Sequence, residues 1–190
     1  MVMSLRRQKS REWSPAFRAI GLLLILISYL SGCAAETASR PNLNRSLLDQ
    51  ENIKRVAVLT FETPVDDPQA GSHISKLFES YLLQTNLYQI AERGEIEKVL
   101  KERGFGKTSE MDKATLRQLG ELLQVDGLVL GAVSHYNRFN FGFTARLVSI
   151  KSGLVLWSIS QTGGMIFRPL SQVADQTVQL AVKELQSKIR

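Results

Sequence analysis

Apolar residues beyond position 52 recur with two spacings, one typical of strands and the other typical of helices. Arg55–Glu62, RVAVLTFE, is a nearly continuous β-branched and apolar run, which predicts a buried strand. After the loop PVDDPQAGS, apolar residues at helical spacing predict an amphipathic helix of about 13 residues. These residues are Ile74, Leu77, Phe78, Tyr81 and Leu82. Tyr88–Arg93 then predicts a second strand.

The middle of the chain predicts two further helices. The first carries Ile96, Val99 and Leu100 on one side. The tetrapeptide SEMD at 109–112 has the pattern of a capping box, which predicts that the second helix begins there. That helix carries Leu116, Leu119 and Leu123.

The last third of the chain predicts strands joined by short turns, followed by a helix. Asp126–Tyr136 is a third apolar strand. In the next strand every second residue is apolar, as in a strand with one exposed face. Those residues are Phe139, Phe141, Phe143, Ala145 and Leu147. The turn Lys151–Gly153 leads to a strand at Leu154–Thr162, and the last helix follows Pro169.

The predicted order of elements is β-α-β-α-α-β-β-β-α. Helices between the early strands predict parallel pairing, whereas short turns between the late strands predict antiparallel pairing. We therefore expect an α/β fold with a single mixed parallel and antiparallel sheet packed with helices. It would occupy residues 53–190, and 190 residues in all are enough for about one domain of ordinary size.

The N-terminus has a different pattern. A basic stretch precedes an apolar run at Ala19–Leu30, which is shorter than the roughly 20 residues of a membrane-spanning helix. This layout, followed by small residues, is typical of a secretory signal. Here the small residues lead directly to Cys33, the only cysteine of the chain. The alternative is a short uncleaved anchor beside a cysteine without a role.

The sequence LSGC at 30–33 resembles the lipobox of bacterial lipoproteins. This resemblance implies cleavage between Gly32 and Cys33 and attachment of lipid to Cys33. By resemblance to sorting in Gram-negative lipoproteins, Ala34 after the cysteine favours the outer membrane and a domain in the periplasm. We thus expect a signal peptide at 1–32, a lipid anchor with a short polar tether at 33–52, and the α/β domain at 53–190.

The basic excess of the chain is concentrated in this leader. The chain has 24 basic and 18 acidic residues, of which residues 1–32 hold five and one. The remainder therefore carries 19 basic and 17 acidic groups, a net charge of +2. So small a charge gives little attraction to a phosphate backbone, and we expect no nucleic-acid partner.

Motifs that carry chemistry are scarce. GFGKTSE at 104–110 contains Gly-Lys-Thr, but a P-loop needs a glycine where Lys101 stands, so we expect a helix-ending glycine and no nucleotide. His73 and His135 are too few for a zinc site, and no Gly-x-Ser-x-Gly elbow occurs. Asp66 and Asp67 fit a solvated loop. We therefore expect no metal, no cofactor and no enzymatic activity.

The alternating phenylalanines leave two interpretations open. Phe139, Phe141 and Phe143 are either the core-facing side of their strand or a stripe that contacts a partner or lipid.

Taken in order, four segments of the chain resemble the curli-assembly lipoprotein family, the CsgG type. They are VAVLTFE, LYQIAERGEIEKVLKERGF, LGELLQVDGLVLGAVS and ARLVSIKSGLVLWSISQTG. More distantly, the chain resembles lipoproteins that activate penicillin-binding proteins and the N-terminal domain of TolB. The best-known members of the CsgG family form oligomeric outer-membrane channels through two long hairpins per subunit. Here only Asn137 and Arg138 separate the third predicted strand from the fourth. This connection is too short for a long hairpin, so those hairpins are missing.

The resemblance implies a non-catalytic lipoprotein on the periplasmic face of the outer membrane. It would act in assembly or secretion through a protein partner or a homo-oligomer. Two alternatives stay open, a regulator of a peptidoglycan synthase and a small-ligand-binding or hydrolytic domain. The last predicts a deep polar pocket near the C-terminal strand ends.

Overall fold

The computed structural model describes residues 41–63, 67–108, 111–137, 140–164 and 168–190. The chain divides into two units, residues 1–35 and 36–190, and the described residues all belong to the second. Cys33, Gly32 and Phe139, which the sequence singled out, lie outside the described residues. In chain order the elements are β1 (Asn42–Leu43), α2 (Arg45–Glu51), β2 (Arg55–Val58), α3 (Ala70–Gln84), β3 (Gln89–Ile90), α4 (Arg93–Arg103), α5 (Lys113–Leu122), β4 (Gly127–Tyr136), β5 (Asn140–Ser149), β6 (Val155–Gly164) and α6 (Leu170–Ile189).

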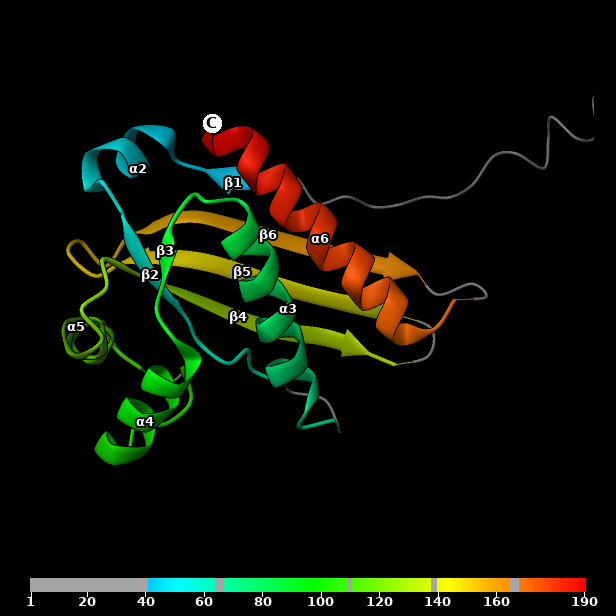
Figure 1. The fold of residues 1–190 in the computed structure, drawn as a ribbon, viewed down its shortest axis with the longest axis horizontal. Helices are drawn as coiled ribbons and strands as arrows, with labels where there is room; N and C mark the ends of the chain where they lie inside the picture. Colours follow the sequence, from blue (N-terminus) through cyan, green and yellow to red (C-terminus); the bar gives the residue numbers. More distant parts are fainter. Residues whose placement is uncertain (1–40, 64–66, 109–110, 138–139, 165–167) are drawn as a thin grey trace, which may run out of the picture. The chain divides into compact units, whose positions relative to one another are not determined.

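The strands of the described residues form one six-stranded sheet in the order β1-β6-β5-β4-β2-β3 (Figure 1). β2 pairs in parallel with β3 and with β4, whereas β4, β5, β6 and β1 pair antiparallel in succession. The predicted fold class is confirmed, and from β2 onward the order of elements is the predicted one. Helical crossovers join the parallel strands, and a turn at Gly153, with φ of +68°, joins β5 to β6.

The structure differs from the expected tether at 33–52. β1 pairs with Trp157 and Ser158 of β6, and α2 begins at Arg45 after Asn44, whose side chain accepts a hydrogen bond from the Leu47 N–H. Leu48 of α2 is buried in the main core. The folded domain therefore includes residues 42–51, because this segment closes one edge of the sheet.

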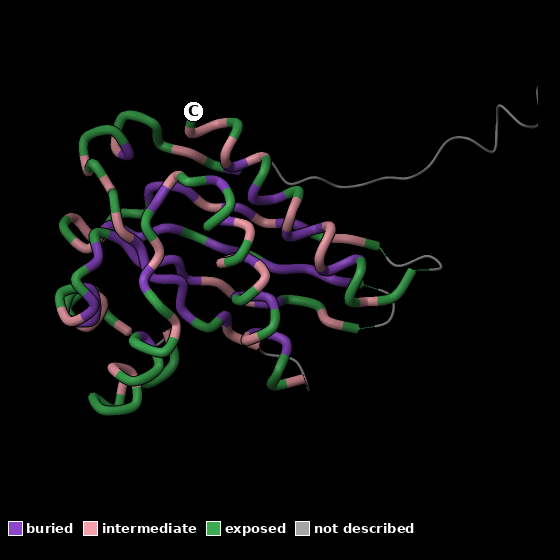
Figure 2. Tube along the Cα trace, viewed as in Figure 1, coloured by how far each residue is buried: buried purple, intermediate pink, exposed green. Residues whose placement is uncertain are grey.

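The helices cover the two faces of the sheet unequally. α3 and α6 lie together along one face, over buried residues of β4, β5 and β6 (Figures 1 and 2). Phe61, Phe78, Phe143 and Trp157 pack there, with ring centroids 5.7–6.3 Å apart. On the other face α4 and α5 pack over a second core cluster, to which the sheet region contributes Ala57, Leu59, Leu128, Leu130 and Val148. The rest of that face, over β5 and β6, has no helix on it among the described residues.

Candidate functional site

The uncovered part of the sheet is built from alternating side chains. On β5, Phe141, Phe143 and Ala145 point to α3 and α6, so Thr144 and Arg146 point the opposite way. Strand register places Ser160 of β6 opposite Thr144, and Ser158 opposite Arg146. Residues in the same rows continue onto the neighbouring strands, as Ala132 and Leu130 on β4 and Asn42 on β1. We call this surface the open face; its residues are Asn42, Ala132, Thr144, Arg146, Ser158 and Ser160. Leu130 borders it but is buried in the cluster under α4 and α5.

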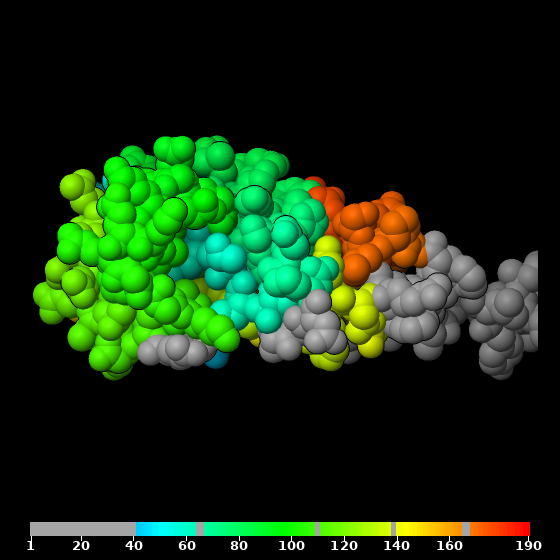
Figure 3. Space-filling view, turned by 90° about the horizontal axis from the view of Figure 1, so that it is seen from below, coloured from blue at the N-terminus to red at the C-terminus, as the bar shows by residue number. Residues whose placement is uncertain are grey.

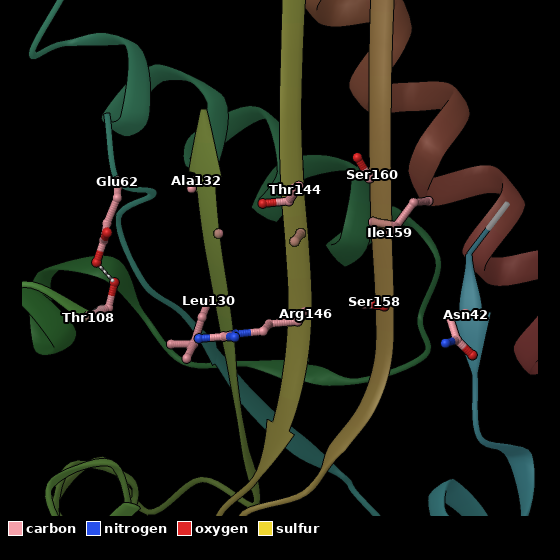
Figure 4. Close-up of a pocket in the computed structure, with 12 residues that line it drawn as sticks. Asn42, Glu62, Thr108, Leu130, Ala132, Thr144, Arg146, Ser158, Ile159 and Ser160 are labelled. Atoms are coloured by element: carbon pink, nitrogen blue, oxygen red, sulfur yellow. Dashed lines mark hydrogen bonds between the residues drawn. The ribbon is translucent and has the colours of Figure 1, made fainter. Parts of the chain in front are cut away.

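The open face is hollowed because most of its side chains are short. A depression of about 530 Å³ lies over it, bounded by Glu62 and Thr108 at one side and by Asn42 at the other (Figure 4). Thr144, Ser158 and Ser160 share its floor with Leu130 and Ala132. The long side chain of Arg146 crosses this floor from β5 toward Leu130 of β4. A surface of this shape leaves room for the side chains of another protein.

Two charged residues line the depression, and they differ in their bonding partners. Glu62 accepts a hydrogen bond of 2.7 Å from the Thr108 hydroxyl, which ties the end of β2 to the segment before α5. Arg146 is exposed and has no carboxylate within ion-pair distance in the described part of the chain. Its guanidinium has its donors available, and such a group forms paired hydrogen bonds with carboxylates. The open face thus offers a cation among hydroxyl groups.

A second hollow lies at the C-terminal end of β2. It has a volume of about 510 Å³ and is lined by Leu59–Thr63, Pro68, Leu100, Ala132 and 106–108. The segment that follows β2 can be seen at the surface between α3 and α4 in Figure 3. The polar residues of this hollow are Glu62, Lys107 and Thr108, together with Thr60 and Thr63, which follow β2. This is the position where the small-ligand hypothesis predicted a pocket.

Of the phenylalanines proposed as a partner-contacting stripe, Phe141 and Phe143 are fully buried. They stack on each other with ring centroids 5.8 Å apart, under α3 and α6. The core-facing interpretation is therefore the correct one for these two residues, because the helices that follow β2 and β6 pack on this side of β5. Sequence reasoning missed Thr144, Arg146, Ser158 and Ser160, although their alternation with apolar residues is readable in the sequence.

Chemical groups elsewhere are dispersed. Within the described residues no three side chains of the His, Cys, Asp and Glu types come close enough to share a metal ion. His135 contacts the Ser134 hydroxyl at 3.2 Å, and His73 lies on α3. Burial raises the pKa of Tyr88, and burial together with the nearby Asp67 raises the pKa of Tyr136. None of the helices in the described part combines the length and the apolar character needed to span a bilayer.

These features define an α/β domain with one sheet, whose one face is covered by two helices and whose other face is partly open. Residues 53–142 match the family model described as "Curli production assembly/transport component CsgG". The resemblance to this family that the sequence predicted is confirmed over these residues.

Solved structures with a similar fold include two of bacterial origin. The PelC dodecamer from Paraburkholderia phytofirmans is 19% identical with a TM-score of 0.53, covering 77% of this chain and 95% of that one. Lipoprotein GNA1162 from Neisseria meningitidis is 17% identical with a TM-score of 0.57, covering 72% and 99%. At sequence identities of 17–19%, the similarity shows a shared fold and nothing about function. A search of curated protein sequences finds no match.

Proposed function

We propose that this protein is a non-catalytic lipoprotein of the outer membrane, facing the periplasm, that works by protein–protein contact in an assembly or secretion complex. Its contact surface is the open face of the sheet, and the contact joins copies of this chain. The observation that carries the proposal is the asymmetry of the sheet. α3 and α6 bury one face, whereas on the other face Thr144 and Arg146 are exposed and Ser158 and Ser160 are half-buried.

The chemistry of the open face supports association rather than catalysis. The lining of the depression contains neither histidine nor lysine, and its one carboxylate, Glu62, is bonded to the Thr108 hydroxyl. The short side chains of the floor let a partner approach closely, and Arg146 supplies a directional contact. A stable interface buries about 800 Å² on each partner, so a contact centred on the depression would extend over neighbouring parts of the sheet.

Self-association is supported by the match to PelC, whose crystal structure is that of a dodecamer. The open face is not self-complementary in charge, since its one unpaired charge is the cation of Arg146. Contact with a different surface of the next copy is therefore favoured, and repeated contacts of this kind form a ring when the rotation from copy to copy closes. The two large apolar side chains exposed on α3 and α6, Leu83 and Leu180, lie on the helix-covered side.

Membrane attachment is supported by the basic leader, the short apolar run and the LSGC sequence that ends at Cys33. Two or three acyl chains hold a protein at a membrane almost permanently, whereas one binds reversibly. Mass spectrometry of the protein from native envelopes tests this part. We expect a chain that begins at an acylated Cys33, and a Cys33→Ser variant that keeps its leader. An unmodified Cys33 in the parent protein would refute the anchor.

The contact surface is tested by the oligomeric state of the full mature protein in detergent, measured by light scattering after size-exclusion chromatography. We expect an oligomer that Arg146→Glu and Ser160→Arg each weaken by at least about tenfold in dissociation constant. Lys101→Glu, which makes the same charge change on the exposed side of α4, is the control and should have no effect. A protein that stays monomeric at all concentrations, or an oligomer indifferent to both open-face variants, would sink the proposal.

A further inference from the structure

The open face borders a pair of exposed apolar side chains. Leu154 and Val155 lie where the turn after β5 enters β6, and they are 42% and 44% exposed. Val155 pairs with Val148, which belongs to the cluster under α4 and α5, so Val155 points to the same side of the sheet as the open face. On β5, Val148 follows Arg146 by two residues, which places Val155 in the next row after Arg146 and Ser158. The open face therefore continues into an apolar surface.

The turn that carries this apolar pair has a fixed shape and a positive charge. Gly153 has φ of +68°, and the Ser149 N–H donates a hydrogen bond of 2.9 Å to the Leu154 carbonyl. Lys151 is exposed on the turn, with no carboxylate within ion-pair distance among the residues that the structure describes. A turn that is already ordered loses little conformational entropy on binding. We call residues 151–155 the apolar turn.

A groove between α3 and α4 lies at the β3 edge of the sheet, whereas β5 and β6 lie toward the other edge. Its volume is about 510 Å³. Leu83 of α3 is 57% exposed and forms an apolar wall, and the half-buried Ile90 of β3 lies beside it. A hollow of this size with an apolar wall can receive the side chains of a short apolar segment.

The charged residues of this groove differ in their partners. Arg93 and Glu79 form an ion pair, in which the Arg93 Nε donates a hydrogen bond of 2.9 Å to the Glu79 carboxylate. Glu92 is exposed before α4 and makes no capping hydrogen bond through its side chain. Lys76 lies on α3 two helical turns before Leu83. Glu92 is therefore the carboxylate of the groove that a cation can approach.

We propose that the apolar turn of one copy docks into the groove between α3 and α4 of the next copy. Leu154 and Val155 contact Leu83 of the next copy, and Lys151 lies beside Glu92. This inference rests on the proposed function, because it names the surface that receives the border of the open face. A second copy is the occupant that the charges favour, since the turn carries a cation and the groove carries a carboxylate.

The positions of the two surfaces agree with head-to-tail association. The groove and the apolar turn lie toward different edges of the sheet, so each copy can use both at once. The apolar contact supplies a centre from which water is excluded, and the hydroxyl groups and Arg146 of the open face supply polar contacts around it. The open face alone has no exposed apolar centre of this kind.

Light scattering of the full mature protein in detergent tests the apolar contact. Leu83→Asp and Val155→Asp should each raise the dissociation constant of the oligomer by about tenfold or more, because each places a carboxylate in the apolar centre. Leu180→Asp is the matched control. Leu180 is 48% exposed on α6 and lines neither surface, so its substitution should leave the dissociation constant unchanged.

Exchange of the two charges tests the pairing of turn and groove between copies. Lys151→Glu and Glu92→Lys should each weaken the oligomer by about fivefold, because each brings like charges together. An equimolar mixture of the two variants should regain the affinity of the parent protein, since every contact between unlike copies then joins opposite charges. A variant that failed to fold would not be restored by mixing.

The outcomes separate this docking from the proposed function. An oligomer that Arg146→Glu weakens, but that Leu83→Asp and Val155→Asp leave intact, would overturn the docking and leave the open-face contact standing. A protein that is monomeric at every concentration would overturn both. Equal weakening by Leu180→Asp, or a mixture of the charge variants no tighter than its components, would also overturn the docking.

Discussion

The hydroxyl of Ser149, at the end of β5, donates a hydrogen bond of 2.8 Å to the carboxylate of Glu51 on α2. Ser149 is fully buried, and its oxygen also accepts a hydrogen bond of 3.2 Å from the Ser152 N–H in the turn to β6. This contact joins residues 98 positions apart and holds α2 against the sheet. α2 is therefore part of the domain rather than of a tether.

Glu51→Ala should lower the free energy of unfolding by about 1–3 kcal/mol, because it leaves the buried Ser149 hydroxyl without its acceptor. Urea unfolding measures this loss. Asp49→Ala, an exposed position on the same helix, is the control, and we expect a change within about 0.5 kcal/mol. Equal effects of the two substitutions would mean that the contact contributes nothing beyond helix propensity.

Phe143 and Thr144 are neighbours in sequence on opposite faces of β5. Phe143→Ala should cost about 3–5 kcal/mol of stability, because the ring packs against Phe61 and Phe78 in a closed core. Thr144→Ala, on the open face, should change stability by no more than about 0.5 kcal/mol. Thermal unfolding of both variants checks the assignment. A small loss for Phe143→Ala would contradict the buried position of the ring.

Gly163 and Gly164 form a second matched pair at the end of β6. A Cβ at Gly163 would lie 2.6 Å from Thr177 Oγ1 and 2.9 Å from Val173 Cγ1, whereas at Gly164 it would meet no atom within 4 Å. Gly163→Ala should therefore push α6 away and cost about 1–3 kcal/mol. Gly164→Ala should be neutral or slightly stabilising. Comparable unfolding midpoints for the two variants would show that α6 adjusts freely.

Asp112 begins α5 and gives the fold a dependence on pH. Hydrogen bonds from the Thr115 side chain and its backbone N–H lower the pKa of the Asp112 carboxyl from its ordinary value. The unfolded chain therefore takes up this proton at a higher pH than the folded chain. The ionised carboxylate stabilises the fold above about pH 4, and this contribution is lost as the pH falls through the folded pKa.

Asp112→Asn keeps an acceptor for the Thr115 N–H but removes the charge. We expect the parent chain to be the more stable at neutral pH, with a difference that shrinks as the pH falls below about 4. Unfolding curves from pH 7 to pH 2.5 measure it, with Asp49→Asn as the control. A difference that stays constant with pH would show that the charge of Asp112 plays no part.

Much of the fold follows from local patterns of side chains. The order from β2 to α6 was predicted because apolar spacing distinguishes helices from strands without any knowledge of partners. Gly104, predicted as a helix-ending glycine, ends α4 with φ of +65°. The start of α5 was placed too early, at the SEMD segment. Its N-cap is Asp112, whose carboxylate accepts a hydrogen bond from the Thr115 N–H.

By itself, then, the sequence determined which residues alternate on β5 and that the sheet is mixed. Only the tertiary structure decided that β1 and α2 belong to the domain, because a two-residue strand and a seven-residue helix are stable only where β6 and the core hold them. The tertiary structure alone also decided that Phe143 is buried and Arg146 exposed. Alternation marks two faces of a strand, but the packing of α3 and α6 determines which of the two is covered.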